Sequence, residues 1–491
     1  MKKLCKTLIA LVLTLICTGV AFGANVKADE KSGDFEYKIK KDGTIMITSY
    51  TGSDNIVTIP EEIDGIKVTS LGAKCFDNWY VEEGDKKLII SSNVNSINKE
   101  TFKFAYISKI EVVDSNKYYY VKKSMLIENK TGTLIVYTGN AEKISIPNGV
   151  KRISEYAFWR SIELRTIYIP KSVTAIEDGF WGNTSLEKIK ISSQNKKYKT
   201  IDGVLFNKKG TKLIYYPEGL VQPYDTYYVP EGVKKIGKYA FDDVTSNLKN
   251  IYLSEGVTTI EENAFVGCQC LEYVYIPKSV KNIHENTFDE YNEKLTIVCD
   301  KSSNAWNYVE VIKASGNRPF TCEEPILLKN AEIKLEKTEY IYNGKEKNPK
   351  VEIIVNGKKL IGYPNYVVEY VNNKNIGKAT VFIKGLGKYV GCKVKFDILP
   401  RKVEGLNIVS NKSTNVKLTW KKSSKVTGYE VYRSNSKNGT YKKVKTIKNN
   451  TYTDKKLKSK NTYYYKVRAY KNVSGKKVYS LWCLVKSVIV K

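Results

Sequence analysis

The chain has 491 residues, which is enough for roughly three domains. Hydrophobic residues make up 42% and charged residues 27%, a globular composition, and Lys and Arg outnumber the acidic residues by 81 to 51. The single His argues against acid–base catalysis by histidine and against a histidine-rich metal site.

Residues 1–23 are predicted to form a secretory signal peptide. Lysines at the start precede an apolar run from Leu8 to about Ala21, and small residues follow. The run is too short for a membrane span, and no later stretch is apolar enough to form one. Cleavage after Gly23 and cleavage after Ala28 both fit the pattern. We therefore expect a secreted, extracellular protein without a membrane span, and association with the cell wall stays open.

Seven cysteines remain after the signal peptide, and their odd number and irregular spacing do not form a disulfide framework. Cys75 and Cys268 occupy positions where small buried residues recur, so we expect them to pack in a core. Cys299 and Cys322 are candidates for one disulfide, because export permits such bonds, but their spacing alone does not decide it.

Within residues 24–326 one phrase returns, with neighbouring copies 23 or 24 residues apart. Its template is I-x-I-P-x-x-V-x-x-I-x-x-x-A-F, and "YYVPEGVKKIGKYAF" at 227–241 keeps the Pro, Val, third Ile, Ala and Phe of this template. The I-x-I element alternates, which predicts a short strand with both Ile side chains on one face. Because one such strand cannot bury that face alone, we expect a solenoid whose coils stack about 4.8 Å apart in a parallel sheet. Each copy reaches a phenylalanine, and these are Phe76, Phe102, Phe158, Phe180, Phe241, Phe265 and Phe288.

Two segments, 114–138 and 192–217, interrupt the period. Each holds two apolar runs around a turn that contains glycine, "ENKTGT" in the first and "NKKGT" in the second. Both segments are predicted to be β-hairpins that project from one edge of the solenoid.

The two ends of the repeat region are predicted to carry caps. Residues 35–50 indicate a hairpin that turns at Asp42-Gly43 and covers the first coil. Residues 299–316 indicate a helix at the other end, opened by Ser302 or Ser303 as the N-cap.

These features together are specific to one family. Residues 35 to about 320 resemble the BspA-like leucine-rich repeats of bacterial surface proteins, through "VKKIGKYAF", "IEENAFVGCQCLEYVYIP" and "DGVLFNKKGTKLIYYP". The resemblance implies adhesion and protein binding without catalysis.

Near Pro325 the period stops, and residues 327–401 hold five or six alternating apolar runs separated by turns. This spacing predicts a small antiparallel β-sandwich. The segment looks like the immunoglobulin-like modules of secreted Gram-positive proteins.

Residues 402–491 are similar to a fibronectin type III domain. Trp420 is expected on the second strand, Tyr429 and Tyr432 on the third, and Leu457 followed by Tyr463 matches the tyrosine corner. A packing role is predicted for these aromatic residues. The expected fold is therefore mainly β, with a leucine-rich-repeat solenoid followed by two antiparallel β-sandwich modules.

The middle residue of each I-x-I strand is expected to point away from the core. In the later coils these residues form a predicted binding ladder on the sheet face, and they are Tyr168, Lys190, Tyr228, Tyr252 and Tyr275. We expect the ladder to contact a protein or a glycan. The alternative is that the tyrosines only stabilise neighbouring strands by stacking.

The sequence contains no pattern that predicts catalysis, a metal site or a cofactor. His284 lies at a variable repeat position and has no second His to work with. The acidic pairs Glu61-Glu62 and Glu261-Glu262 fall in variable slots and are interpreted as solubilising. No phosphate-binding loop, calcium loop or zinc spacing occurs.

The positive charge is concentrated at the C-terminal end. Residues 402–491 hold 23 Lys or Arg against three acids, residues 327–401 hold 15 against seven, and the repeat region is nearly neutral. We expect the last module to be attracted to polyanions, with anionic cell-wall polymers as partners. The lysines are not arranged in a nucleic-acid recognition fold, so no specific nucleic acid is expected.

The predicted function is that of a secreted or surface-associated bacterial binding protein, adhesin-like and non-catalytic, whose repeats recognise host or cell-surface macromolecules. Two alternatives remain open at this point. One is an accessory protein that binds polysaccharide through aromatic residues, and the other is an extracellular binder of polyanions or nucleic acid.

Overall fold

The computed structural model describes residues 30–491 except 78, 80–84, 160, 178–179, 181, 245–247, 289–291, 317–319 and 413. The predicted signal peptide, residues 1–23, lies outside the described residues. The chain forms two compact units. The first comprises Met1–Leu220, Gly237–Ser246 and Asn263–Gly267, and the second comprises Val221–Ile236, Asn247–Glu262 and Cys268–Lys491.

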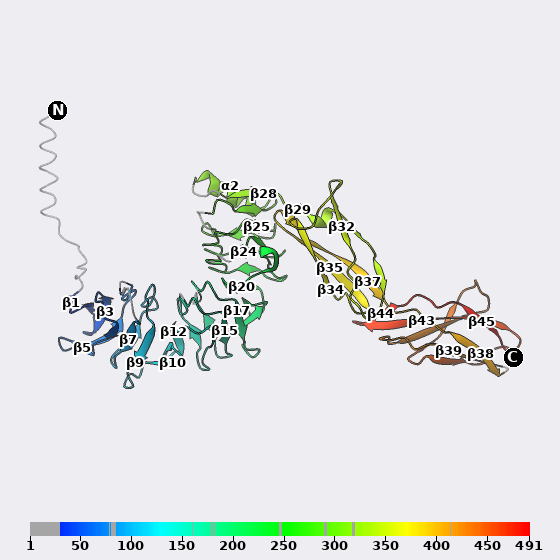
Figure 1. The fold of residues 1–491 in the computed structure, drawn as a ribbon, viewed down its shortest axis with the longest axis horizontal. Helices are drawn as coiled ribbons and strands as arrows, with labels where there is room; N and C mark the ends of the chain where they lie inside the picture. The colour runs from blue at the N-terminus through cyan, green and yellow to red at the C-terminus, as the bar shows by residue number, and fades with distance from the viewer. Residues whose placement is uncertain are drawn as a thin grey trace, which may run out of the picture. The chain divides into compact units, whose positions relative to one another are not determined.

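The first unit begins with the expected hairpin, which turns around Asp42 and Gly43 (Figure 1). Its second strand continues into the coils through a parallel pairing in which Ile45 lies opposite Val68. The Asp42 carboxylate accepts hydrogen bonds from the Thr44 hydroxyl and amide, which lower the pKa of Asp42 to about 2. The strands of this cap are β1 (Glu30–Ser32), β2 (Phe35–Ile39), β3 (Ile45–Tyr50), β5 (Glu62–Ile63) and β6 (Ile66–Leu71).

Each coil of the first unit contributes a three- or four-residue strand to a parallel sheet, as the I-x-I pattern predicts. The strands form two separate three-stranded sheets, β4-β7-β9 and β13-β15-β17, because the segment 114–138 intervenes between them. In a second column, two-residue strands follow Val94, Val150 and Val173. The bounds are β4 (Ile56–Thr58), β7 (Lys87–Ile90), β9 (Lys109–Val112), β13 (Lys143–Ser145), β15 (Thr166–Ile169), β17 (Lys188–Ile191), β8 (Ser96–Ile97), β14 (Arg152–Ile153) and β16 (Ala175–Ile176).

The two interruptions contain the predicted hairpins, and each has a third strand. The third strand of the first hairpin pairs in parallel with β14, where Leu134 lies opposite Ile153, so this hairpin extends the second column of strands. The bounds are β10 (Tyr119–Lys122), β11 (Met125–Glu128), β12 (Thr133–Tyr137), β18 (Tyr198–Ile201), β19 (Val204–Asn207) and β20 (Lys212–Tyr215).

A buried asparagine fixes each hairpin to the preceding coil. The Asn195 side-chain amide donates to the carbonyl oxygens of Pro170 and Val173 at 3.0 and 2.9 Å. Its Oδ1 accepts from the amides of Lys197 and Tyr198. Asn116 makes the corresponding four bonds in the first hairpin. The amide nitrogen and oxygen of each asparagine side chain therefore have hydrogen-bond partners, which offsets the cost of burying these polar atoms.

The repeat phenylalanines form an aromatic spine through the first unit. Phe158 and Phe180 stack with ring centroids 5.6 Å apart, and Phe241 and Phe265 stack at 5.1 Å. Where the hairpins interrupt the repeat, tyrosines take the place of phenylalanine. Tyr137 lies 5.8 Å from Phe158, Tyr215 lies 5.3 Å from Phe180, and Tyr216 lies 5.3 Å from Phe241.

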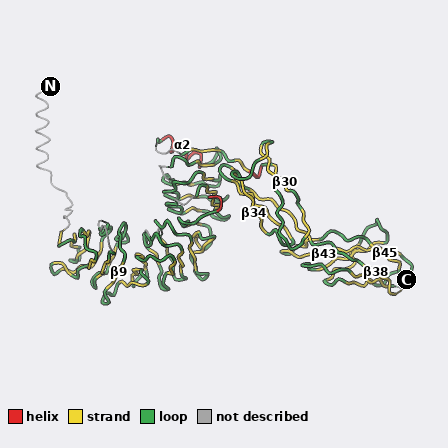
Figure 2. The backbone as a smooth tube through the Cα atoms, viewed as in Figure 1, coloured by secondary structure: helices red, strands yellow, loops and turns green. Residues whose placement is uncertain are grey.

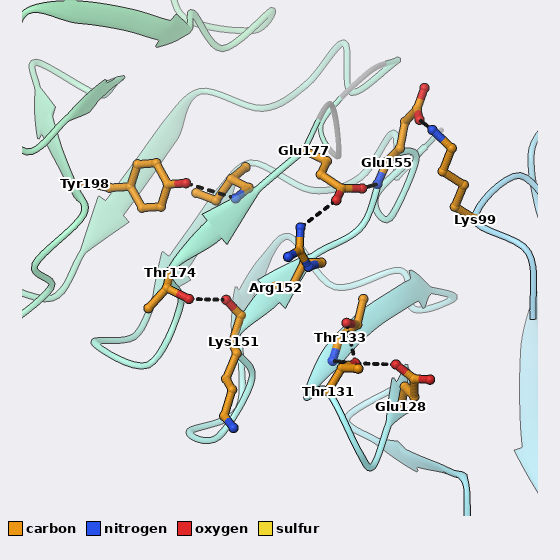
Figure 3. Close-up of polar contacts among 11 residues, drawn as sticks. Lys99, Glu128, Thr131, Thr133, Lys151, Arg152, Glu155, Thr174, Glu177 and Tyr198 are labelled. Atoms are coloured by element: carbon orange, nitrogen blue, oxygen red, sulfur yellow. Dashed lines mark hydrogen bonds and ion pairs between the residues drawn. The ribbon is translucent and has the colours of Figure 1, made fainter. Parts of the chain in front are cut away.

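Polar side chains connect neighbouring coils on the surface of the first unit (Figure 3). The Arg152 guanidinium contacts the Glu177 carboxylate at 2.8 Å, and Glu177 also accepts from the Glu155 amide. Lys99 reaches the Glu155 carboxylate at 2.5 Å across 56 residues of sequence, so it joins the coils on either side of the first hairpin. Exposed pairs of this kind contribute about 0–1 kcal/mol each.

The second unit continues the repeat with a five-stranded parallel sheet, and strands and turns alternate regularly through these coils (Figure 2). The expected helix follows the last repeat coil, and its N-cap is Ser303, because the Ser303 hydroxyl accepts from the Trp306 amide at 3.2 Å. The bounds are η1 (Pro223–Asp225), β21 (Thr226–Tyr228), β23 (Asn250–Tyr252), β25 (Tyr273–Tyr275), β27 (Thr296–Val298), β28 (Thr321–Glu323), β22 (Lys235–Ile236), β24 (Thr259–Ile260), β26 (Asn282–Ile283) and α2 (Asn304–Ala314).

The segment after the repeats folds into a three-stranded sheet, β30-β32-β33, and a four-stranded sheet, β31-β37-β35-β34. Side chains from both sheets share one core, which includes Ile353, Val381 and Phe396. A short parallel pair, β29-β36, precedes them. The bounds are β29 (Ile326–Leu327), η2 (Leu328–Asn330), β30 (Glu332–Leu335), β31 (Glu339–Ile341), β32 (Val351–Val355), β33 (Lys358–Lys359), β34 (Tyr366–Val371), β35 (Gly377–Gly385), β36 (Tyr389–Val390) and β37 (Cys392–Leu399).

The last module packs two antiparallel sheets around Trp420 and Tyr429, whose rings lie 5.3 Å apart. Trp420 directly follows β39, and the Tyr463 hydroxyl accepts from the Lys458 amide at 3.2 Å, which is the tyrosine-corner bond. Tyr432 lies on the outer face of its sheet against Trp482. The bounds are β38 (Asn407–Lys412), β39 (Asn415–Thr419), β42 (Thr451–Asp454), β40 (Gly428–Ser434), β41 (Lys442–Ile447), β43 (Thr462–Val473), β44 (Lys476–Tyr479) and β45 (Lys486–Ile489).

Candidate functional site

The predicted ladder is divided between two sheets. In the first unit Tyr168 lies level with Lys190, with a buried isoleucine on each side of Tyr168 in the strand. In the second unit Tyr228, Tyr252 and Tyr275 lie level with one another on neighbouring strands. The next position in this row is Val298, which pairs with Tyr275.

In the first unit the sheet face is open. Tyr168 is 40% exposed, and the Lys190 side chain beside it is also exposed. The two residues line a hollow of about 620 Å³ together with Glu187, Asp202 and Leu220. This surface therefore presents an aromatic ring, an ammonium group and carboxylates side by side.

In the second unit the sheet face is covered. Tyr228 and Tyr252 stack with ring centroids 5.0 Å apart, and Tyr252 and Tyr275 lie 6.3 Å apart. Tyr252 and Tyr275 retain only 5% and 7% of their surface. Burial raises the pKa of all three tyrosines, so their hydroxyls are neutral and act as hydrogen-bond donors.

The groups that bond Tyr228 and Tyr252 belong to the turn at the end of β35 in the same unit. The Tyr228 hydroxyl donates to the carbonyl oxygen of Gly385 at 2.5 Å, and the Tyr252 hydroxyl donates to that of Gly387 at 2.6 Å. The Gly387 amide in turn donates to the Asn250 side chain at 3.3 Å. A tyrosine suits this contact because its ring is apolar while its tip bonds a backbone carbonyl.

The turn "GLGK" at 385–388 requires its two glycines. A Cβ atom on Gly385 would lie 2.0 Å from the carbonyl oxygen of Tyr389. Gly387 has a φ of +60°, in the left-handed region, and lies close to the Tyr273 ring. The sequence predicts here only one of the turns that separate the apolar runs of residues 327–401. The signal that this prediction missed is a pair of glycines flanking an apolar residue, which permits close approach of another part of the chain.

Charged groups and a second hollow lie beside the contact between the tyrosines and the turn at 385–388. Lys393 pairs with Glu231 at 3.1 Å, and the Lys384 ammonium lies 5.5 Å from the centroid of the Tyr228 ring. A hollow of about 760 Å³ remains beside the three tyrosines. Of the five predicted ladder residues, the structure thus leaves Tyr168 and Lys190 on an open face and places Tyr228 and Tyr252 against the chain's own turn. The Tyr275 hydroxyl instead donates to the Glu255 carboxylate at 3.2 Å.

An aromatic cluster that the sequence analysis did not single out lies in the first unit, on the turn side of the coils. The Trp159 ring lies 5.4 Å from Phe104 and 6.3 Å from Tyr106, and Tyr106 is 48% exposed. Tyr106 and Trp159 line a hollow of about 490 Å³. These side chains occupy variable positions between strands, where no periodicity marks them.

The polar groups considered for catalysis have structural surroundings. His284 is exposed, and Glu61 accepts from the Ser92 amide and hydroxyl, which lower the pKa of Glu61. The seven cysteines of the described residues are all free, including Cys299 and Cys322, and Cys75 and Cys268 are buried as expected. In the described parts of the chain, no three His, Cys or acidic side chains are grouped to hold a metal ion.

Comparison with family models identifies the repeats. The model of the BspA type leucine rich repeat region matches residues 45–131, 135–226 and 221–308, as six copies. The chain belongs to the BspA-type leucine-rich repeat family. A fibronectin type III model matches residues 401–481. No match was found among curated proteins.

Solved structures of other bacterial repeat proteins are similar to this BspA-type chain. A leucine-rich repeat protein from Eubacterium ventriosum is 27% identical, with 55% of this chain and 70% of that chain covered and a TM-score of 0.35. The pneumococcal vaccine antigen PcpA is 17% identical, with 60% and 98% covered and a TM-score of 0.33. A leucine rich cell surface protein from Faecalibacterium prausnitzii is 21% identical, with 58% and 98% covered and a TM-score of 0.30.

Membership of this family limits the kinds of function and the cellular location that are expected for the chain. BspA-like repeat proteins are cell-surface or secreted bacterial proteins, and both families matched here are typically binding or structural rather than catalytic. Across the residues with a described structure, no helix has the length and apolar character needed to cross a bilayer.

Proposed function

We propose that this BspA-type protein is a secreted, adhesin-like binding protein without catalytic activity, and that its repeats recognise a protein or glycan on another surface. The observation that carries the proposal is the open sheet face in the first unit, where Tyr168 is 40% exposed beside the exposed Lys190. An exposed ring with a hydroxyl at its tip supplies apolar contact area and a hydrogen bond at little conformational cost.

Mixed charge around Tyr168 supports recognition of a polar macromolecule. Lys190 supplies a cation, whereas Glu187 and Asp202 supply carboxylates around the same hollow. Such a surface favours a ligand with both apolar and polar groups, as a protein segment or a glycan has. Specificity then depends on how well those groups are matched.

The full-length protein should be screened against immobilised matrix proteins and a glycan array. Ligands found in this way should bind a Tyr168→Ser/Lys190→Ser variant at least about tenfold more weakly, because the two changes remove the ring and the cation. The control is Lys171→Ser, an exposed lysine on the turn after the same strand. Equal binding by all three proteins would contradict the proposal.

The proposal includes a tether. The fibronectin type III domain carries 23 basic residues against three acids, so we expect it to hold the protein to anionic cell-wall polymers. Washing intact cells with 1 M salt should release the full-length protein, because the Debye length falls to about 3 Å. Retention after the wash, or release already at low salt, would argue against an electrostatic tether.

Polysaccharide binding is a second candidate function, favoured by the hollow beside Tyr106 and Trp159. Sugar rings present C–H groups on one face, which pack on aromatic rings, and the hollow adds polar groups such as Thr138 and Ser161. A Tyr106→Ala variant that loses glycan binding while Tyr168→Ser retains it would favour this candidate.

A further inference from the structure

The outer face of the sheet β41-β40-β43-β44 in the fibronectin type III domain carries alternating cations and aromatic rings. We call it the cation–aromatic face. The Arg468 guanidinium lies 3.6 Å from the centroid of the Tyr479 ring and 4.6 Å from that of Trp482. The Lys466 ammonium lies 4.4 Å from Trp482 and also 4.4 Å from Tyr441. The rings therefore hold both cations in defined positions.

A single buried carboxylate anchors this face. Glu430 is 1% exposed, and its Oε2 accepts from the Arg468 Nη2 and Nε at 2.7 and 3.1 Å. Its Oε1 lies 3.0 Å from the Lys477 ammonium and 3.6 Å from that of Lys443. One negative charge is thus shared by three cations, and Lys466 adds a fourth. The face keeps a net positive charge.

No other carboxylate of the domain offsets this charge. The three acids of residues 402–491 are Glu404, Glu430 and Asp454. Asp454 is buried and pairs with Arg433 at 2.8 Å, while Glu404 precedes β38 of the other sheet. The side chains of Lys443 and Lys477 remain 49% and 33% exposed, so their ammonium groups are accessible to an anionic ligand.

We propose that the cation–aromatic face is the binding site for a base-free phosphodiester chain, such as a polyol phosphate. The inference rests on the proposed tether and gives it a location and a ligand chemistry. Phosphate is favoured because it accepts several hydrogen bonds from ammonium groups that are already positioned, which keeps the entropy cost of binding low.

The coverage of the rings decides against nucleic acid. Proteins that bind single-stranded nucleic acid stack bases on open aromatic faces. Here Lys466 and Arg468 both lie within 4.6 Å of the Trp482 centroid, and Arg468 covers Tyr479. A ligand that approaches this face therefore meets cations rather than open aromatic rings, so the face favours a phosphate chain without bases.

The test uses the full-length protein and two triple variants that lose equal charge. The face variant is Lys443→Gln/Lys466→Gln/Lys477→Gln, and the control variant is Lys422→Gln/Lys455→Gln/Lys458→Gln, at exposed lysines outside this sheet. The probes are poly(glycerol phosphate) and oligo(dT) of equal phosphate number. Binding is measured by fluorescence anisotropy between 50 and 300 mM NaCl. Lys466→Gln alone serves if the face variant does not fold, because Lys466 does not contact Glu430.

The face variant should bind poly(glycerol phosphate) about tenfold more weakly than the control variant, and its salt slope should fall by about 2 for three lost phosphate contacts. For Lys466→Gln alone, a loss of about threefold and a slope change of about 0.7 are expected. The wild-type protein should bind oligo(dT) no more tightly than poly(glycerol phosphate).

Three results would overturn the inference. Equal losses in the face and control variants would leave the tether intact but remove the site. Tighter binding of oligo(dT) than of poly(glycerol phosphate) would identify a nucleic-acid site instead. Failure of the wild-type protein to bind either polymer at 50 mM NaCl would remove both the site and the tether.

Discussion

The Tyr252 hydroxyl donates a hydrogen bond of 2.6 Å to the backbone carbonyl oxygen of Gly387, which lies 135 residues further along the chain. Tyr252 is an outward-facing residue of the repeat sheet, and Gly387 belongs to the module that follows the repeats. The second unit therefore uses part of its predicted binding ladder to hold a neighbouring module. The sheet face around Tyr168 in the first unit stays open, and it is the face that we propose binds other ligands.

Replacing Tyr252 by Phe removes this hydrogen bond but keeps the stacked ring. The contact should weaken by about 1 kcal/mol, the net value of a typical hydrogen bond. The Gly387 amide, which donates to Asn250 in the same contact, should then exchange its hydrogen roughly fivefold faster. Tyr168→Phe is the matched control and should leave that rate unchanged. Equal rates in both variants would mean that the Tyr252 bond does not hold the turn.

Asn195→Ala should destabilise the first unit. The change leaves the carbonyl oxygens of Pro170 and Val173 buried without their donor, so we expect a loss of about 3 kcal/mol in the free energy of unfolding. Urea unfolding followed by circular dichroism measures the loss. The neighbouring exposed residue provides the control, since Gln194→Ala should cost less than about 0.5 kcal/mol. Similar midpoints for the two variants would contradict a structural role of the buried amide.

The sequence predicted the parts of the fold that depend on local periodicity. The I-x-I strands, the two hairpins and the helix predicted to begin at Ser302 or Ser303 follow from alternation, turn chemistry and capping, which are properties of neighbouring residues. The family and the fibronectin type III domain were also identified correctly.

Long-range partners were not predictable in the same way. The strand pattern placed Tyr228, Tyr252 and Tyr275 on one outward face, but nothing in it indicates that a turn 157 and 135 residues later would bond the first two. Asn116 and Asn195 stand three residues before Tyr119 and Tyr198, a correspondence visible in the sequence. Their burial, however, depends on carbonyl groups of the preceding coil.

The first unit should lose stability as the pH rises. Burial, reinforced by Asp243, raises the pKa of Glu218 to about 8 from its ordinary 4.5. The neutral carboxyl therefore stabilises the fold fully below pH 4.5, and this contribution disappears as the pH passes 8, with a span on the order of 4 kcal/mol. Glu218→Gln should flatten the decline in urea unfolding between pH 5 and 9. The exposed control Glu187→Gln should show the same decline in stability as the wild-type protein. If the decline also persists in Glu218→Gln, Glu218 is not its cause.

The fibronectin type III domain should respond to pH in the opposite direction. Burial alone would raise the pKa of Glu430, but its bonds with Arg468 and Lys477 outweigh burial and lower it. Stability from this group is present above pH 4.5 and is lost as the pH falls through the lowered pKa. Glu430→Ala should cost about 2 kcal/mol at pH 7, because the Arg468 charge loses its partner. Thermal unfolding of the domain at pH 3 and pH 7 tests this. Glu404→Ala, at an exposed carboxylate, should have little effect.

The most direct test of the binding account compares two tyrosines that share one strand position in different units. Affinity for a ligand found in the screen should be measured for full-length Tyr168→Ser and Tyr228→Ser proteins. We predict that Tyr168→Ser weakens binding at least about tenfold, whereas Tyr228→Ser disturbs the contact with Gly385 and leaves the affinity unchanged. Loss of binding in Tyr228→Ser with full binding in Tyr168→Ser would contradict the account, because the ligand would then require the face that the module covers.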